Sequence, residues 1–232
     1  YRRPGHYRVY TQPETRMWCC VGSGLENHTK YGELIYAHNG NDLLVNLFIP
    51  SRLDWKEKGV TVTQNTKFPF EEKTELVIKT DKAKEFVLRI RCPKWAGGTA
   101  VDVAINGKPY KTDIDGDNYV SIVRKWKNGD KVELQLPMEV EVSRWYVNSV
   151  AVERGPLVYG LQMKENWEKK EFPDNEKTQY GTYYFEVTSP TKWNYGIVNF
   201  RQEDIPNHFK VSIDTQKQQS SFFWNTENAP IQ

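Results

Sequence analysis

Short apolar or alternating segments follow one another from residue 42 onward, and their spacing is the feature that most restricts the fold. They are rich in β-branched and aromatic residues and are bounded by turn formers. Asn106-Gly107 lies inside one of them and is a strong hairpin signal. Short strands at roughly ten-residue spacing favour antiparallel sandwiches over a parallel α/β sheet, so we predict a mainly β chain. The predicted strand segments are 43–49, 60–66, 74–80, 85–92, 101–111, 118–124, 130–137, 139–145, 149–161, 183–187, 196–200 and 209–213.

The density of strand segments changes near residue 143. Before it the segments come regularly, whereas the polar, charge-rich segment 164–181 interrupts them afterwards. A stretch of that composition is typical of a solvated loop. We therefore predict two antiparallel, jelly-roll-like β-sandwiches, one over residues 38–142 and the other over residues 143–232.

One helix is predicted ahead of the strands. Residues 1–22 contain prolines and glycines that break a long helix, so we expect an irregular region there. The tetrapeptide Ser-Gly-Leu-Glu fits a capping box, with Ser23 as N-cap and Glu26 bonded back to its amide. Turn formers at 38–42 end the helical pattern.

The charge balance excludes two classes of partner. The chain has 32 Lys and Arg residues against 30 Asp and Glu residues, a net charge of +2, and no long run of one sign. The charge distribution therefore gives no indication of binding to nucleic acid or to an anionic membrane. No apolar stretch approaches the roughly 20 residues that span a bilayer. Because the first residues include neither an initiating Met nor an apolar leader, we expect the interior of a longer protein, and no compartment is assigned.

Aromatic residues make up 13% of the chain, and we expect most of them to pack in the core or at its edge. Exposed flat rings also stack on the apolar faces of sugars. A non-catalytic, carbohydrate-binding β-sandwich is therefore an alternative hypothesis for the function. The aromatic residues that motivate it are Trp145, Tyr146, Trp193 and Tyr195.

Cys19 and Cys20 are adjacent in a chain that has only three cysteines. They are open to four interpretations: coincidental core residues, a strained vicinal disulfide, two thiolates on one metal ion, or a nucleophile with its neighbour. We expect them in a loop just before the helix, where free amides and the helix dipole favour a thiolate. Arg16 would add positive charge, and Gly22 and Gly24 would allow a ligand to approach the backbone.

The other cysteine and the histidines do not complete a metal site in the sequence. Tetrahedral zinc needs four ligands, and the chain has no second Cys-x-x-Cys and no His-x-x-x-His. Cys92 lies on a predicted strand, and we interpret it as an inert core or edge residue. We expect solvent-facing or packing roles for His6, His28, His38 and His208. A third hypothesis makes Cys19 and Cys20 part of a purely structural metal site or of an intermolecular contact.

The segment WCCVGSGLENHTKYGELIYAHNGNDLLVNLFIPSRLDWKEKGVTVTQ closely resembles the β-L-arabinofuranosidases of glycoside hydrolase family 127 and their relatives. The downstream segments RIRCPKWAGG, INGKPY, WKNGDKVELQLPMEVE and VAVERGPLVYGL are also similar to that family. The resemblance covers most of residues 16–161, and the cysteine pair with its glycine-rich helix is its most specific part. It implies that residues 1–37 are the end of an (α/α)6 barrel, with a Cys-Cys loop and one remaining helix.

The resemblance also implies roles for the cysteine pair. Cys19 would be the nucleophile of a retaining glycoside hydrolase and a zinc ligand, and Cys20 would be a second zinc ligand. The substrate would be an arabinose-containing oligosaccharide or plant-type glycan, from which the enzyme releases L-arabinofuranose. The family takes its acid/base Glu and the remaining zinc ligands from upstream barrel segments. Glu14 is the only Glu before Cys19 and does not match that motif, so we expect the isolated chain to be inactive without the missing N-terminal barrel.

Overall fold

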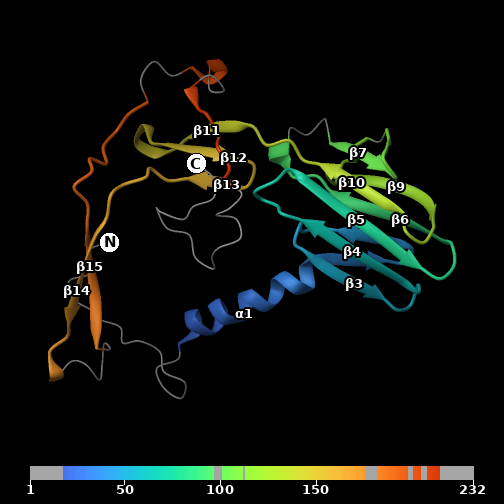
Figure 1. Cartoon of the computed structure of the whole chain (residues 1–232), viewed down its shortest axis with the longest axis horizontal. Coiled ribbons are helices and arrows are strands. Elements are labelled where there is room, and N and C mark those ends of the chain that lie inside the picture. The colour runs from blue at the N-terminus through green and yellow to red at the C-terminus, as the bar shows by residue number, and fades with distance from the viewer. Residues whose placement is uncertain are drawn as a thin grey trace. The chain divides into compact units, whose positions relative to one another are not determined.

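A computed structural model describes residues 18–96, 101–111, 113–175, 182–197, 201–204 and 208–214. The mainly β prediction is confirmed: the described residues form several open sheets that follow one α-helix, α1 (Cys19–Leu34) (Figure 1). The chain divides into two compact units. Unit 1 comprises residues 1–32 and 161–197, and unit 2 comprises residues 33–160 and 198–232. No helix in the described ranges is long and apolar enough to cross a membrane.

Unit 2 contains a four-stranded sheet in the order β1-β2-β6-β9. Its neighbours pair antiparallel except β2 and β6, which run parallel, so the antiparallel prediction does not hold for this pair. A parallel pair needs a long crossover, and the intervening strands supply it. The strands are β1 (Tyr36–Asn39), β2 (Asp42–Val45), β6 (Lys84–Arg91) and β9 (Tyr119–Trp126).

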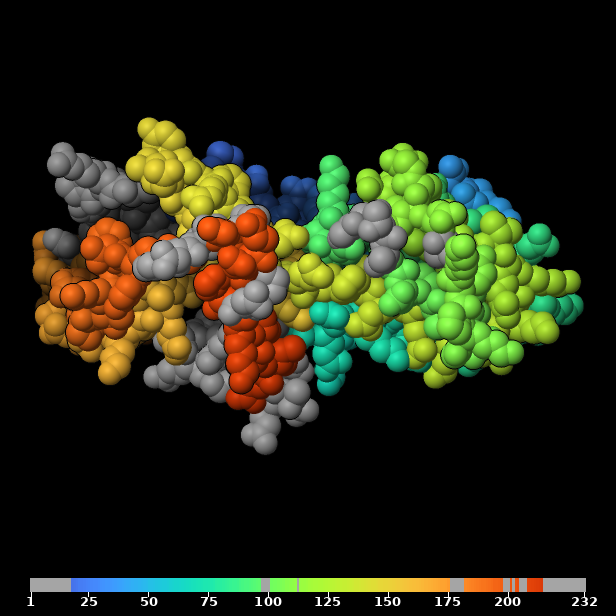
Figure 2. Space-filling view, turned by 90° about the horizontal axis from the view of Figure 1, so that it is seen from above, coloured from blue at the N-terminus to red at the C-terminus, as the bar shows by residue number. Residues whose placement is uncertain are grey.

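A six-stranded antiparallel sheet has the order β3-β4-β5-β10-β7-β8. Its buried residues alternate along the strands and form one apolar core with those of the four-stranded sheet. Figure 2 shows residues 101–135 of this region, green to yellow-green, as a closely packed surface. The strands are β3 (Ser51–Trp55), β4 (Val60–Thr66), β5 (Lys73–Thr80), β10 (Lys131–Gln135), β7 (Asp102–Ile105) and β8 (Lys108–Pro109).

Aromatic rings fill the centre of this core. The ring of Phe86 stacks on Trp126 at a centroid distance of 5.5 Å and meets Trp55 edge-on at 5.7 Å. The indole nitrogen of Trp126 donates to the carbonyl of Phe86 at 3.0 Å, so its polar atom is satisfied in the interior. These three rings pack in the core, as predicted for most aromatic residues, whereas Trp145, Tyr146, Trp193 and Tyr195 are exposed.

The local predictions succeed where alternation is strong. The strand predicted at 60–66 is β4 (Val60–Thr66), and the predicted hairpin joins β7 to β8 through Asn106 and Gly107, both with positive φ. Of the predicted strand 43–49, only the first part is extended, in β2. Of the segment 196–200, residues 198–200 lie outside the described residues, and Gly196 and Ile197 form no strand. The segment 209–213 is not a strand either and has only an isolated bridge at Ile213.

A three-stranded antiparallel sheet consists of β11 (Val140–Arg144), β12 (Val150–Arg154) and β13 (Leu157–Tyr159). Short 3-10 helices lie at Lys94–Ala96 (η1), Tyr146–Asn148 (η2) and Gln202–Asp204 (η3). The predicted boundary at residue 143 falls inside β11, and the division into two sandwiches stays a prediction.

In unit 1, β14 (Asn166–Glu171) pairs antiparallel with β15 (Tyr183–Thr188). The solvated loop predicted for 164–181 is therefore wrong over β14. The strand is polar because both its faces are largely exposed, and cross-strand contacts hold it instead of a core. Lys170 contacts Glu168 and Glu186, and the rings of Trp167 and Phe185 meet edge-on at 5.6 Å.

Candidate functional site

The cysteine pair lies in the first turn of α1. The carbonyl of Trp18 accepts hydrogen bonds from the amides of Val21 at 3.0 Å and Gly22 at 3.2 Å, so the helix begins at Cys19. The predicted loop for the pair is therefore wrong, and so is the predicted N-cap, because Ser23 lies within the helix. Glu26 pairs with Lys30 at 3.1 Å, one turn further along.

Both thiols of the pair face solvent. Cys19 and Cys20 are exposed and free, and their sulfur atoms lie 3.8 Å apart. This distance is almost twice the roughly 2.05 Å of a disulfide bond, which excludes the vicinal disulfide in this structure. Neither thiol belongs to the apolar core of the described residues. An exposed pair of thiols favours two of the interpretations, a metal-binding pair and a nucleophile with its neighbour.

No further ligand joins the pair within the described residues. Those residues contain no group of three or more His, Cys, Asp or Glu side chains that could hold a metal ion. His28 lies on α1 with its ring 6.4 Å from that of Tyr31, and the ring of His38 lies 5.7 Å from that of Trp55. His208 is exposed. Arg16, His6 and Glu14 lie outside the described residues.

Cys92 has the opposite environment and is buried, as expected. Its backbone amide donates to the carbonyl of Asn118 at 2.7 Å, and its thiol lies 3.8 Å from the carbonyl of Ile90. Burial raises the pKa of the Cys92 thiol to about 11. The neutral thiol is the stable form, so this cysteine is a poor nucleophile and a poor metal ligand.

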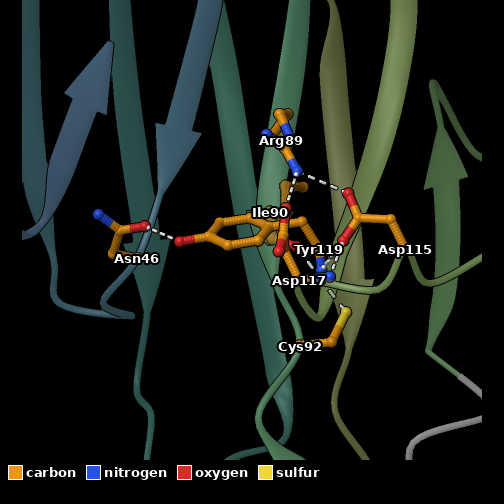
Figure 3. A network of polar contacts seen from close by, with 7 residues as sticks. All are labelled: Asn46, Arg89, Ile90, Cys92, Asp115, Asp117 and Tyr119. Carbon is orange, nitrogen blue, oxygen red and sulfur yellow. Dashed lines mark hydrogen bonds and ion pairs between the residues drawn. The ribbon is translucent and has the colours of Figure 1, made fainter. Parts of the chain in front are cut away.

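A polar network lies on the four-stranded sheet (Figure 3). Asp115 accepts hydrogen bonds from the guanidinium of Arg89 at 2.6 Å and from the amides of Tyr119 and Asp117 at 2.9 and 3.0 Å. The Arg89 guanidinium lies 5.0 Å from the Tyr119 ring centre, and the Tyr119 hydroxyl donates to the Asn46 side chain at 2.6 Å. The amide of Tyr119, then the Arg89 guanidinium and the Asp117 amide, hold the pKa of Asp115 below its ordinary value. These mutual contacts fix the start of β9 and indicate a structural role.

No local pattern in the sequence indicates this network, because its members come from three separate segments. Arg89 and Asp115 are 26 positions apart, and Asn46 is 73 positions from Tyr119. Only the fold of the sheet brings them together.

A shallow hollow of about 730 Å³ lies on the outer face of the six-stranded sheet. An ion pair between Lys73 and Glu133 lies at this hollow, and Gln135 donates to Glu72 at 3.0 Å. Lys73 and Glu133 are thus paired across the neighbouring strands β5 and β10. Its lining includes Lys73, Asp102, Ala104, Tyr110, Glu133 and Gln135.

Comparison with known proteins identifies the central part of the chain. Residues 42–138 match the family model of the GH127 middle domain, β-L-arabinofuranosidase. No curated protein matches the sequence. The cysteine pair lies upstream of the matched residues.

Three solved structures share the fold, each with a TM-score of 0.54. The GH127 β-L-arabinofuranosidase of Geobacillus stearothermophilus T6 is 24% identical, and the alignment covers 78% of this chain and 32% of that one. A GH127 β-arabinofuranosidase is 21% identical, and the alignment covers 74% of this chain and 35% of that one. A protein described as a glycoside hydrolase is 22% identical, and the alignment covers 83% of this chain and 37% of that one. The chain therefore spans about a third of the length of these relatives. At these identities they show the fold alone.

Proposed function

Because residues 42–138 carry the middle domain of the GH127 β-L-arabinofuranosidase family, we propose that this chain is the C-terminal portion of a retaining glycoside hydrolase. Its parent protein releases L-arabinofuranose from plant-type glycans, with Cys19 as the nucleophile. The observation that carries this proposal is the exposed pair of thiols immediately upstream of a GH127 domain.

The spacing of the two sulfur atoms supports a shared zinc ion. Two thiolates bound to tetrahedral zinc at about 2.3 Å lie roughly 3.8 Å from one another. The sulfur atoms of Cys19 and Cys20 are 3.8 Å apart. The pair therefore fits two of the four positions around zinc, and we assign the other ligands to polypeptide outside this chain. Zinc, when bound, keeps a thiol deprotonated and oriented.

The proposed reaction has two displacements at the anomeric carbon. The sulfur of Cys19 attacks this carbon, a carbon–sulfur bond forms, and the glycosidic carbon–oxygen bond breaks. A carboxylic acid outside this chain gives its proton to the leaving oxygen. Water then attacks the same carbon, gives a proton to that carboxylate, and displaces the thiolate. Two inversions leave the anomeric configuration retained.

The exposure of α1 supports a covering polypeptide. The helix has no buried residue, although Leu25 and Leu34 are 61% and 55% exposed. A helix of a globular protein normally buries its apolar side chains. We propose that the helical barrel of the parent protein covers α1 and brings the acid and the remaining ligands to Cys19. The alignments cover 32%, 35% and 37% of the three solved relatives, so most of the length of each relative lies outside the part that this chain matches.

Turnover of an aryl β-L-arabinofuranoside tests the proposal. The full-length parent protein should be active and should contain stoichiometric zinc, whereas the 232-residue chain should show no turnover. In the parent protein, Cys19→Ser should abolish activity because it removes the soft thiolate. Cys20→Ser should lower the zinc content, which is measured by metal analysis.

Cys92→Ser is the matched control, since Cys92 is buried and has no role in the proposed chemistry. It should leave the turnover of the folded parent protein largely unchanged. Equal losses of activity in Cys19→Ser and Cys92→Ser would contradict the assignment of the nucleophile. Tight stoichiometric zinc in the 232-residue chain would contradict the assignment of ligands to other polypeptide.

A further inference from the structure

Three large apolar side chains lie uncovered at the end of the β11–β12 hairpin. Trp145, Tyr146 and Val147 are 66%, 90% and 78% exposed. With Asn148 they form what we call the aromatic tip, residues 145–148. In Figure 2 the yellow part of the chain, which includes this tip, reaches the surface. Exposed apolar residues that follow one another in this way mark a binding surface more often than isolated ones do.

The backbone of the aromatic tip is held in an unfavourable conformation. Val147 has φ 58° and ψ 35°, and Asn148 has φ 57°, so both lie in the left-handed region. A β-branched residue rarely adopts this conformation. Ser149 closes the turn, because its carbonyl accepts from the amide of Trp145 at 2.8 Å and its hydroxyl donates to the carbonyl of Tyr146 at 2.7 Å. Strain that is maintained by surrounding bonds is concentrated at ligand-binding sites.

A chain of hydrogen bonds orients the indole of Trp145. Its ring nitrogen donates to the hydroxyl of Ser143 at 2.8 Å, and that hydroxyl donates to the carboxylate of Glu153 on the neighbouring strand at 2.5 Å. The polar edge of the ring is thus fixed by the sheet while most of its surface remains open to solvent. A ring that is already oriented loses little conformational entropy when a ligand stacks on it.

The chemistry of the aromatic tip fits a neutral sugar. Residues 145–152 include no charged side chain, so nothing in the tip selects an ionic ligand. Aromatic faces offer flat apolar area to the C–H groups of a sugar ring. Asn148 is exposed, and its side-chain amide is a group that pairs with sugar hydroxyl groups. We infer that the aromatic tip is a stacking platform for a neutral oligosaccharide, and this site does not depend on the sulfur chemistry proposed above.

Tryptophan fluorescence and calorimetric titration of the 232-residue chain test this inference. The probes are arabino-, xylo- and cello-oligosaccharides. At least one should shift the fluorescence and bind, and Trp145→Ala should weaken that binding at least tenfold, with Tyr146→Ala also weakening it. Ser143→Ala keeps the ring but removes its hydrogen-bond partner, so it should weaken binding several-fold. Trp167→Ala is the control, since Trp167 is 60% exposed and belongs to β14 instead of the aromatic tip, and it should bind like the original chain.

Circular dichroism shows that each variant is folded before its affinity is compared. Three results would overturn the inference: none of the three probes binds, Trp145→Ala binds as well as the original chain, or Trp167→Ala loses as much affinity as Trp145→Ala. A fourth is that the upstream polypeptide of the parent protein binds the chain through Trp145 and Tyr146, which would make the aromatic tip an internal interface. None of these results bears on whether Cys19 is the nucleophile.

Discussion

The three cysteines of this chain show how strongly the surroundings of a side chain decide its chemistry. Cys19 and Cys20 are exposed at the first turn of a helix, whereas Cys92 is 3% exposed between two sheets. The sequence indicated the burial of Cys92, which lies in an alternating strand, but it left open whether the pair is buried or exposed. It could not give the sulfur–sulfur distance of 3.8 Å, which depends on where the helix begins.

Burial of Cys92 predicts a loss of stability in alkaline solution. Its pKa of about 11 in the folded chain lies above the ordinary value of 9.0. Between these values the unfolded chain has lost the proton that the folded chain still binds, so the free energy of unfolding falls as the pH rises. The contribution is fully present below pH 9 and decreases by roughly 1–2 kcal/mol up to pH 11.

Urea unfolding of the chain and of Cys92→Ala at pH 8 and pH 10.5 measures this effect. Tyr36 also has a raised pKa because of burial, and it titrates in both proteins, so the difference between them isolates Cys92. Stability that falls equally in both proteins over this interval would show that Cys92 does not contribute.

Gly155 is a second residue whose surroundings fix its identity. It has φ +58°, and a Cβ atom there would lie 2.8 Å from the sulfur and 2.9 Å from Cγ of Met138. Gly155→Ala should therefore destabilise the chain by about 2–3 kcal/mol through overpacking and backbone strain. The midpoint of urea unfolding measures the loss. With Met138→Ala added, the total loss should be smaller than the sum of the two single losses. If the two losses simply add, contact with Met138 is not the cause.

At the scale of elements, the sequence predicts strands in which buried and exposed residues alternate. It does not predict elements that depend on contacts between residues far apart in the chain. The strands β4, β5 and β6 bury every second residue, so their pattern is visible in a short window. The strand β14 buries almost nothing, and its polar sequence resembles a loop. The start of α1 was misplaced because Ser23 and Glu26 fit a capping box that the longer helix does not use.

A buried ion pair connects β12 to the segment before β5. The guanidinium of Arg154 donates to Glu72 at 2.8 Å, and the same carboxylate oxygen accepts from the amide of Met138 at 3.1 Å. The Arg154 side chain is only 9% exposed. The pair therefore attaches the three-stranded sheet to the six-stranded one.

Glu72→Gln should destabilise the chain by about 2 kcal/mol, because it leaves the buried Arg154 cation without its charged partner. Glu71→Gln is the matched control, since Glu71 pairs with Lys67 at the surface at 3.1 Å and should contribute almost nothing. Thermal and urea unfolding of both variants provide the comparison. Similar stability of the two variants would mean that the ion pair does not hold the sheets together.

At the scale of the whole molecule, the two units differ in how they are stabilised. Unit 2 has a continuous apolar core that extends from Leu43 to Leu136 in the sequence and is supplied by both of its large sheets. In unit 1, α1 has no buried residue, and only Lys170 and Tyr184 of the β14–β15 hairpin are partly buried. A two-stranded hairpin without a core is marginally stable in water.

Amide hydrogen exchange should therefore separate the two units. Amides of β5 and β6 should exchange only through global unfolding, whereas those of β14 and β15 should exchange through local opening, roughly a thousandfold faster. Mass spectrometry of peptides from the 232-residue chain measures both rates in one experiment, and Glu72→Gln provides an internal check. This variant should speed exchange in β5 and leave the hairpin unchanged, because the hairpin already opens independently of the core. If β14 and β15 are protected as strongly as β5 and slow together with it, the chain unfolds as one cooperative body.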